Sequence, residues 1–212
     1  MSGGSRPIVI PEATPGTKKL AARAALLLVL LAAAWPARGA AGGAFAASAA
    51  PAASTDAAKE YEVKAAFLYH FARYTTWPES AFEKPESPFV IAVVGTDPFG
   101  AALETAFKAK KFGSREIAIA RFEKSDAIGK AHVLFCASND EQQVAEIAKA
   151  CAGKAVLIVG DQPGLAAKGA TAAFFLDKAN VKFEINSEAV KRAGLFISSQ
   201  LLKLARIVED NK

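Results

Sequence analysis

The sequence is poor in the side chains from which metal centres and thiol or imidazole chemistry are built. Among its 212 residues there are two cysteines, Cys136 and Cys151, and two histidines, His70 and His132. They form no Cys-x-x-Cys or His-x-x-x-His pair. Because metal sites need converging cysteine, histidine or carboxylate ligands, we predict no metal site. Each histidine is expected to be a hydrogen-bonded residue in the core or just below the surface.

Motifs of nucleophilic catalysis and of phosphate binding are also missing. No Gly-x-Ser-x-Gly nucleophile elbow is present. Residues 95–100 (GTDPFG) have the glycine spacing that opens a P-loop, but Ala101 and Ala102 stand where a lysine and a hydroxyl residue are required. Ser198 lies where a helix is expected to begin, which suits a capping role. The sequence therefore predicts a protein that is not an enzyme and that carries no cofactor.

A broad excess of one charge is absent from most of the chain. The formal net charge is +5, from 26 basic and 21 acidic residues. The excess is concentrated in residues 1–46, which hold five basic residues and one acidic residue: Arg6, Lys18, Lys19, Arg23, Arg38 and Glu12. Basic and acidic residues nearly balance in the remainder. A phosphate-binding surface, and with it a nucleic-acid partner, is therefore not predicted.

Long apolar runs are confined to the same N-terminal segment. Residues 24–34 (AALLLVLLAAA) follow a basic stretch, and the run is too short to span a bilayer but fits the apolar part of a secretory signal. Residues 44–46 (AFA) match a cleavage site; cleavage after Ala41 and an uncleaved anchor are alternatives. We predict a signal peptide over 1–46, a disordered linker over 47–56 and a mature protein in the periplasm.

Hydrophobic periodicity predicts helices and strands over the rest of the chain. An apolar stripe of Val63, Ala66, Phe67, His70, Phe71 and Tyr74 predicts a helix over 58–74. Nearly continuous apolar runs at 89–94, 131–136 and 155–159 are typical of buried parallel strands, and 116–122 alternates like a strand. Helices are predicted from an Asp97 cap to about 108 and from 138–140 to 150. A hairpin is predicted over 170–176 and 181–185, followed by helices over 187–193 and 198–208.

This order of elements predicts one α/β domain over 57–208, followed by a short tail at 209–212. Strands that alternate with helices indicate a Rossmann-like three-layer sandwich, with a mixed, mainly parallel sheet and an antiparallel edge hairpin. In this arrangement Cys136 ends a strand, and Cys151 ends a helix that runs back by about 18 Å. Two buried free thiols are therefore predicted, with a disulfide as the alternative.

Exposed aromatic residues and a loop cluster are the two candidate sites. Aromatic side chains beside an arginine are the usual composition of an interface hot spot, so we predict a partner-binding surface at Arg73, Trp77 and Phe99; plain packing is the alternative. Ligands of open α/β sheets bind in the crevice at the carboxyl ends of the strands. That rule makes a second candidate, a ligand crevice, of five residues: Gly95, Thr96, Asp97, Gly100 and Asp161.

Several motifs, in order along 60–208, resemble those of the YfiR/HmsC family of periplasmic proteins. They are residues 63–72 (VKAAFLYHFA) with 76–78 (TWP), 95–100 (GTDPFG), 156–161 (VLIVGD), 183–186 (FEIN), 193–195 (AGL) and 197–205 (ISSQLLKLA). The resemblance implies a periplasmic repressor that binds the periplasmic region of an inner-membrane diguanylate cyclase or related sensor. Such binding lowers cyclic-di-GMP synthesis, and with it biofilm formation.

The same resemblance implies further partners and leaves one alternative function open. It implies release of the repressor by an outer-membrane OmpA-like lipoprotein, and a homodimer is also considered. It brings no catalytic residue, in agreement with the missing catalytic motifs. The alternative function is a periplasmic small-ligand sensor or solute-binding module that uses the ligand crevice.

Overall fold

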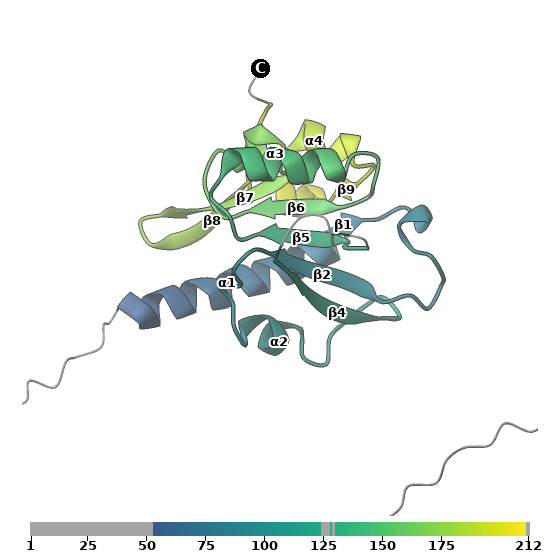
Figure 1. Cartoon of the computed structure of the whole chain (residues 1–212), viewed down its shortest axis with the longest axis horizontal. Coiled ribbons are helices and arrows are strands. Elements are labelled where there is room, and N and C mark those ends of the chain that lie inside the picture. Colours follow the sequence, from purple (N-terminus) through teal and green to yellow (C-terminus); the bar gives the residue numbers. More distant parts are fainter. Residues whose placement is uncertain (1–52, 124–127, 129, 211–212) are drawn as a thin grey trace, which may run out of the picture. The chain divides into compact units, whose positions relative to one another are not determined.

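A mixed eight-stranded sheet forms the centre of the computed structural model, which describes residues 53–123, 128 and 130–210 (Figure 1). The strand order is β10-β8-β7-β6-β5-β2-β4-β3. The strands are β2 (Phe89–Val94), β3 (Lys111–Phe112), β4 (Arg115–Phe122), β5 (Val133–Cys136), β6 (Leu157–Gly160), β7 (Ala172–Asp177), β8 (Asn180–Asn186) and β10 (Arg206–Val208). The predicted signal peptide and residues 47–52 of the predicted linker lie outside the described residues.

The sheet is mainly parallel, as predicted. The pairs β4–β2, β2–β5, β5–β6, β6–β7 and β8–β10 are parallel, whereas the β7–β8 and β3–β4 pairs are antiparallel. The hairpin turns at Lys178 and Ala179, whose φ values of 50° and 66° are those of a tight two-residue turn. Gly160 ends β6 where a Cβ atom would lie 2.8 Å from the Leu165 side chain, so the close approach of the following turn requires glycine.

Helices cover both faces of the sheet, which gives the predicted three-layer α/β architecture (Figure 1). On one face α1 (Ala53–Tyr74) and α2 (Ala102–Phe107) enclose the larger apolar core, which includes Leu68, Phe71 and Phe174. On the other face α3 (Glu141–Ala150) and the 3₁₀ turn η3 (Leu165–Lys168) pack over β5 and β6. None of the helices in this part of the chain is long and apolar enough to cross a membrane.

Helix α1 differs from the prediction in its start and in the face that it buries. It begins at Ala53, so residues 53–56 of the predicted linker are helical. Lys64, Ala65, Leu68, Phe71 and Ala72 are its buried residues, whereas Val63, Ala66 and His70 of the predicted stripe are exposed. The stripe was misplaced because Lys64, a basic residue, is buried through ion pairs with Glu60 and Asp161.

The predicted start of α2 and the predicted C-terminal helix are also wrong. Asp97 does not cap α2, which begins at Ala102; its carboxylate instead accepts a hydrogen bond from the Phe99 amide at 2.8 Å. The helix predicted over 198–208 consists of α5 (Ser199–Leu202) alone, and 206–208 form β10. The β7–β8 hairpin is therefore one strand inside the edge of the sheet.

A buried carboxylate explains why the C-terminal residues form a strand. The side chain of Glu184 is 1% exposed, and it accepts hydrogen bonds from the Gly164 amide at 2.6 Å and from Arg206 at 2.5 Å. A buried charge is tolerated when it is paired and hydrogen-bonded. Arg206 supplies the pairing charge only when its segment lies beside β8, and its guanidinium also lies 4.2 Å from the centre of the Phe175 ring.

Candidate functional site

The turn that follows β2 is held by an internal ion-pair network. Asp97 accepts a hydrogen bond from Nε of Arg121 at 2.6 Å. Arg121, on β4, also pairs with Glu104 at 2.8 Å and donates to the Gly100 carbonyl at 3.2 Å. The hydrogen bonds to Glu104 and Asp97 raise the pKa of Arg121. The hydrogen bond from Arg121 lowers the pKa of the Glu104 carboxyl group. Within the predicted ligand crevice, Asp97 and Gly100 therefore hold the β2 turn against β4, while Thr96 is exposed.

The last residue of the predicted crevice, Asp161, is bound by side chains of α1. It accepts hydrogen bonds from the Tyr61 hydroxyl at 2.7 Å and from Nζ of Lys64 at 2.6 Å. Lys64 also pairs with Glu60, and its side chain is 4% exposed. Burial and the neighbouring Asp161 carboxylate raise the pKa of Tyr61 well above its usual range. The phenol therefore stays protonated and acts as a hydrogen-bond donor.

Tyr61 connects the loops that the sequence places at this edge. Its hydroxyl contacts Asp161 after β6, and its ring lies edge-on to Phe99 after β2 at 5.3 Å. Phe99 in turn lies 4.6 Å from Phe135 in the core. The β2 and β6 loops are thus joined through α1, and these contacts serve to attach the helix to the sheet.

Two of the three residues predicted to bind a partner are buried. Trp77 is 7% exposed and lies edge-on to Phe89 and Phe112 at 4.9 and 5.5 Å. Phe99 is 5% exposed, between Tyr61 and Phe135. The expectation that Trp77 and Phe99 are exposed is therefore wrong, because their ring partners come from distant strands. Arg73 is exposed, as the prediction requires.

The exposed aromatic residue at the end of α1 is Phe196, which the sequence analysis missed. Its side chain is 75% exposed, more than any other large hydrophobic residue that the structure describes. It belongs to β9 (Phe196–Ile197), which pairs with β1 (Thr75–Thr76) so that Phe196 faces Thr76 in register. Strand alternation could have identified it, because Leu195 is buried and Phe196 then points to the opposite side.

The β9 strand that carries Phe196 is attached to the end of α1. The Ser198 amide donates to the Tyr74 carbonyl at 2.8 Å, which attaches the β9 segment to the helix end. The His70 ring stacks on Tyr74 at 6.0 Å between centroids. His70 is exposed, and not a core or subsurface residue as predicted. We call His70, Arg73, Tyr74 and Phe196 the helix-exit surface.

An apolar groove lies at the other end of α1, beside the β7–β8 hairpin. Its volume is about 810 Å³, and it is lined by both elements, with Val63 44% exposed and Leu176 52% exposed. Figure 1 shows the hairpin and the start of α1 at one side of the molecule and β1 and β9 at the other. The molecule therefore presents apolar side chains at both ends of one helix.

The remaining candidate residues show structural roles. Cys136 and Cys151 are free and buried, as predicted, and burial raises the pKa of the Cys136 thiol to about 12, which keeps it unreactive. The Ser198 hydroxyl accepts a hydrogen bond from the Gln200 amide at 3.3 Å, which confirms its capping role. Among the residues that the structure describes, no three histidine, cysteine or acidic side chains gather as metal ligands.

Comparisons with known proteins identify a family over most of the chain. A family model described as YfiR/HmsC-like matches residues 61–206. Among solved structures, a conserved domain protein from Vibrio cholerae O1 biovar El Tor is matched at 16% identity and a TM-score of 0.38, over 56% of this chain and 54% of that one. The ABC domain from Streptococcus pneumoniae, solved in complex with L-Trp, is matched at 11% identity and a TM-score of 0.43, over 57% and 55%. These partial likenesses are too weak to bear on the site. A search of curated proteins finds no match.

Proposed function

Because this chain belongs to the YfiR/HmsC-like family, we propose that it is a periplasmic repressor that binds the periplasmic region of an inner-membrane diguanylate cyclase. Membership of this family supports the role of a periplasmic, non-catalytic regulator of cyclic-di-GMP signalling. By binding the inactive state of the cyclase more tightly than the active state, the repressor shifts the cyclase toward inactivity. Production of cyclic-di-GMP, and the biofilm formation that depends on it, then falls.

The observation that supports this function best is the helix-exit surface. Phe196 is 75% exposed and lies at the end of α1 that also carries the exposed Arg73. An aromatic ring and an arginine that can be desolvated together are typical of the few residues that supply most of an interface's binding energy. We therefore place the partner contact at His70, Arg73, Tyr74 and Phe196, in place of the buried Trp77 and Phe99.

The contribution of Phe196 to partner binding follows from its exposure. Complete burial of a phenylalanine side chain contributes about 1.5–3 kcal/mol. Since Phe196 is largely exposed in the free protein, most of this free energy is available on binding. Its loss corresponds to an affinity decrease of roughly 10- to 100-fold. Such a change is large enough to relieve repression in cells.

The test compares two matched substitutions at the two ends of α1. Phe196→Ser and Leu176→Ser each replace an exposed apolar residue by a small polar one, so neither is expected to unfold the domain. Binding to the purified periplasmic region of the membrane cyclase is measured by biolayer interferometry, and cyclic-di-GMP is measured in cells. We expect Phe196→Ser and Arg73→Ala to weaken binding and raise cyclic-di-GMP, while Leu176→Ser does neither.

Other outcomes of this test separate the surface from the function. If Leu176→Ser weakens binding and Phe196→Ser does not, the partner binds the groove between α1 and the hairpin. If deletion of the protein leaves cyclic-di-GMP unchanged and the purified cyclase region does not bind, the repressor function itself is refuted.

Two further partners are proposed for the same regulator. An outer-membrane OmpA-like lipoprotein would release the cyclase by competing for the repressor, and adding its purified soluble domain should then displace a preformed repressor–cyclase complex. A homodimer through the helix-exit surface would hide Phe196 until a partner is present. Sedimentation velocity distinguishes this state, because Phe196→Ser should shift a dimer to monomer.

A further inference from the structure

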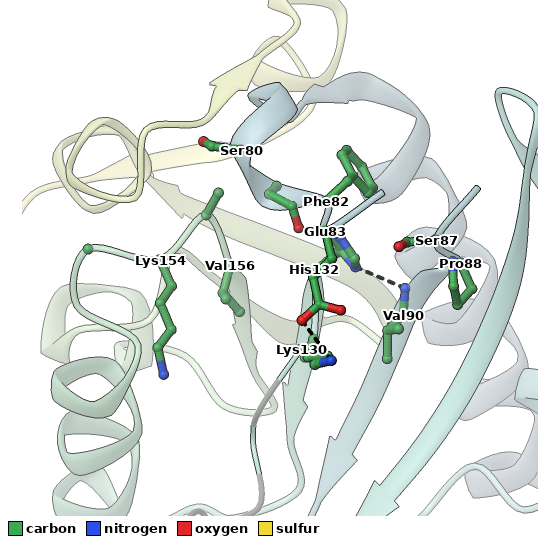
Figure 2. A pocket seen from close by; sticks show the side chains of 14 residues that line it. Ser80, Phe82, Glu83, Ser87, Pro88, Val90, Lys130, His132, Lys154 and Val156 are labelled. Atoms are coloured by element: carbon green, nitrogen blue, oxygen red, sulfur yellow. Dashed lines mark hydrogen bonds and ion pairs between the residues drawn. The ribbon is translucent and has the colours of Figure 1, made fainter. Parts of the chain in front are cut away.

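A cavity of about 610 Å³ opens at the amino ends of the central parallel strands, on the opposite edge of the sheet from the predicted ligand crevice. Its wall is built from three segments: residues 80–90, which lead into β2, residues 130–132, which lead into β5, and residues 153–156, which lead into β6. Figure 2 shows Lys154 and Val156 on one side of this cavity, and Glu83, Lys130 and His132 on the other. Cavities of this size hold small organic ligands.

The His132 side of the cavity is fixed and uncharged. The Val90 amide donates to Nδ1 of His132 at 3.0 Å, so Nδ1 carries no proton. Nε2 therefore carries the proton and donates it to the Ala81 carbonyl at 3.1 Å. The ring is stacked between Phe82 and Phe89 at 4.6 and 4.8 Å between centroids. Burial lowers the pKa of His132, so this wall stays neutral.

Among the described residues, the two lysines that line the cavity differ in their pairing. Lys130 pairs with Glu83 at 2.7 Å on the His132 side of the cavity, and this contact is drawn in Figure 2. Lys154 also lines the cavity and forms no ion pair within the described part of the chain. Phe82, Pro88 and Val156 supply apolar surface between these groups. The lining thus combines a free ammonium group with apolar walls.

We propose that this cavity binds a small organic monocarboxylate with an apolar body. The carboxylate pairs with the Lys154 ammonium group, and the body packs against Phe82 and Val156. A single free lysine matches a single negative charge, whereas a phosphate dianion requires more cationic or backbone donors than this lining offers. The site gives the protein a small-molecule input that is separate from the helix-exit surface, so a failure of the cyclase-binding proposal leaves it untouched.

The experiment uses 3-phenylpropionate and octanoate as probes, with their primary amides as uncharged counterparts. Titration is followed by thermal shift and by the amide chemical shifts of the protein. We expect both carboxylates to raise the melting temperature at millimolar concentration and to move the resonances of Val90, His132 and Val156. The amides should bind about tenfold more weakly, because the charge-assisted hydrogen bond is missing.

Substitution of Lys154 tests whether its ammonium group binds the carboxylate of the ligand. Lys154 is exposed and has no ion-pair partner among the residues that the structure describes, so Lys154→Gln should fold normally while binding the carboxylates about tenfold more weakly and the amides unchanged. Lys203→Gln, an exposed lysine outside the cavity, is the matched control and should bind like the wild type. The proposal is overturned if neither carboxylate binds, if Lys154→Gln leaves their affinity unchanged, or if the shifted resonances are those of residues 95–100 and Asp161.

Discussion

The attachment of α1 to the sheet gives the sharpest stability prediction. Asp161→Ala removes the carboxylate that accepts hydrogen bonds from Tyr61 and Lys64. Lys64 then remains buried with Glu60 as its single partner, and the Tyr61 hydroxyl loses its acceptor. We expect the folded state to be clearly destabilised, although Asp161 lies in a loop and takes no part in the apolar core.

The magnitude follows from what the substitution leaves behind. Removing one partner of a fully buried ion pair costs about 3–5 kcal/mol, because an uncompensated charge remains. Glu60 keeps Lys64 paired, so we reduce the expected loss in the free energy of unfolding to about 2–3 kcal/mol. For a domain of this size, 1 kcal/mol corresponds to about 2–4 °C in melting temperature, so Tm should fall by about 4–12 °C.

The assay is thermal and urea unfolding followed by circular dichroism, at low and high salt. Asp177→Ala is the matched control, because Asp177 pairs with Lys182 on the hairpin surface, where the side chains are 43% and 52% exposed. An exposed pair contributes no more than about 1 kcal/mol, and salt screens it. The Asp161→Ala effect should persist in high salt, whereas that of Asp177→Ala should shrink.

A double substitution decides whether the buried charge is the cause. In Lys64→Met with Asp161→Ala, no buried ammonium group is left behind, and the remaining Glu60 carboxylate is 24% exposed, so this variant should be more stable than the sum of the two single losses predicts. A wild-type melting temperature for Asp161→Ala would refute the reasoning. Additive losses in the double variant would show that the two side chains do not act as a pair.

Three other predictions concern buried polar groups. The Cys136 thiol, whose pKa is raised by burial, should resist alkylation at neutral pH in the native protein and react on unfolding; rapid native labelling would contradict its burial. Because the pKa of His132 is lowered in the folded state, its contribution to stability is present above the unfolded pKa of about 6.5 and is lost as pH falls. Acid unfolding should therefore begin at a higher pH in the wild type than in His132→Asn, and coincident curves would refute this assignment. Glu184→Ala should release Arg206 and speed amide hydrogen exchange in β10, while exchange in β2 stays slow; equal protection of β10 in both proteins would contradict the role of this pair.

The central strands were predictable because their apolar runs carry local information. The run at 89–94 coincides with β2, and the runs at 131–136 and 155–159 overlap β5 and β6 but begin two residues before them, since strands covered on both faces need apolar residues at every position. The C-terminal strand was not predictable in this way. Leu201, Leu204 and Ala205 have a helical spacing that predicts a helix to 208, but 206–208 form β10, where Arg206 contacts Glu184, 22 residues away in sequence.

The candidate site was predictable in part, and the errors have one cause. The location of Arg73 at the exposed end of α1 follows from the helix that the sequence predicts. The burial of Trp77 and Phe99 does not, because it depends on rings contributed by β2, β3 and β5. Phe196 was overlooked for the converse reason, since a phenylalanine between Leu195 and Ile197 resembles core.

The outermost strands of the sheet have a consequence for the behaviour of the protein in concentrated solution. Strand β3 pairs with only the first two residues of β4, and β10 with only the last three of β8, so within the described residues 117–122 of β4 and 180–183 of β8 have no strand on their outer side. Long open borders of this kind are where chains join into fibrils and aggregates. In concentrated solution a neighbouring molecule could therefore extend the sheet along the outer side of β4, and a substitution that adds charge along 117–122 should make the protein less prone to precipitate.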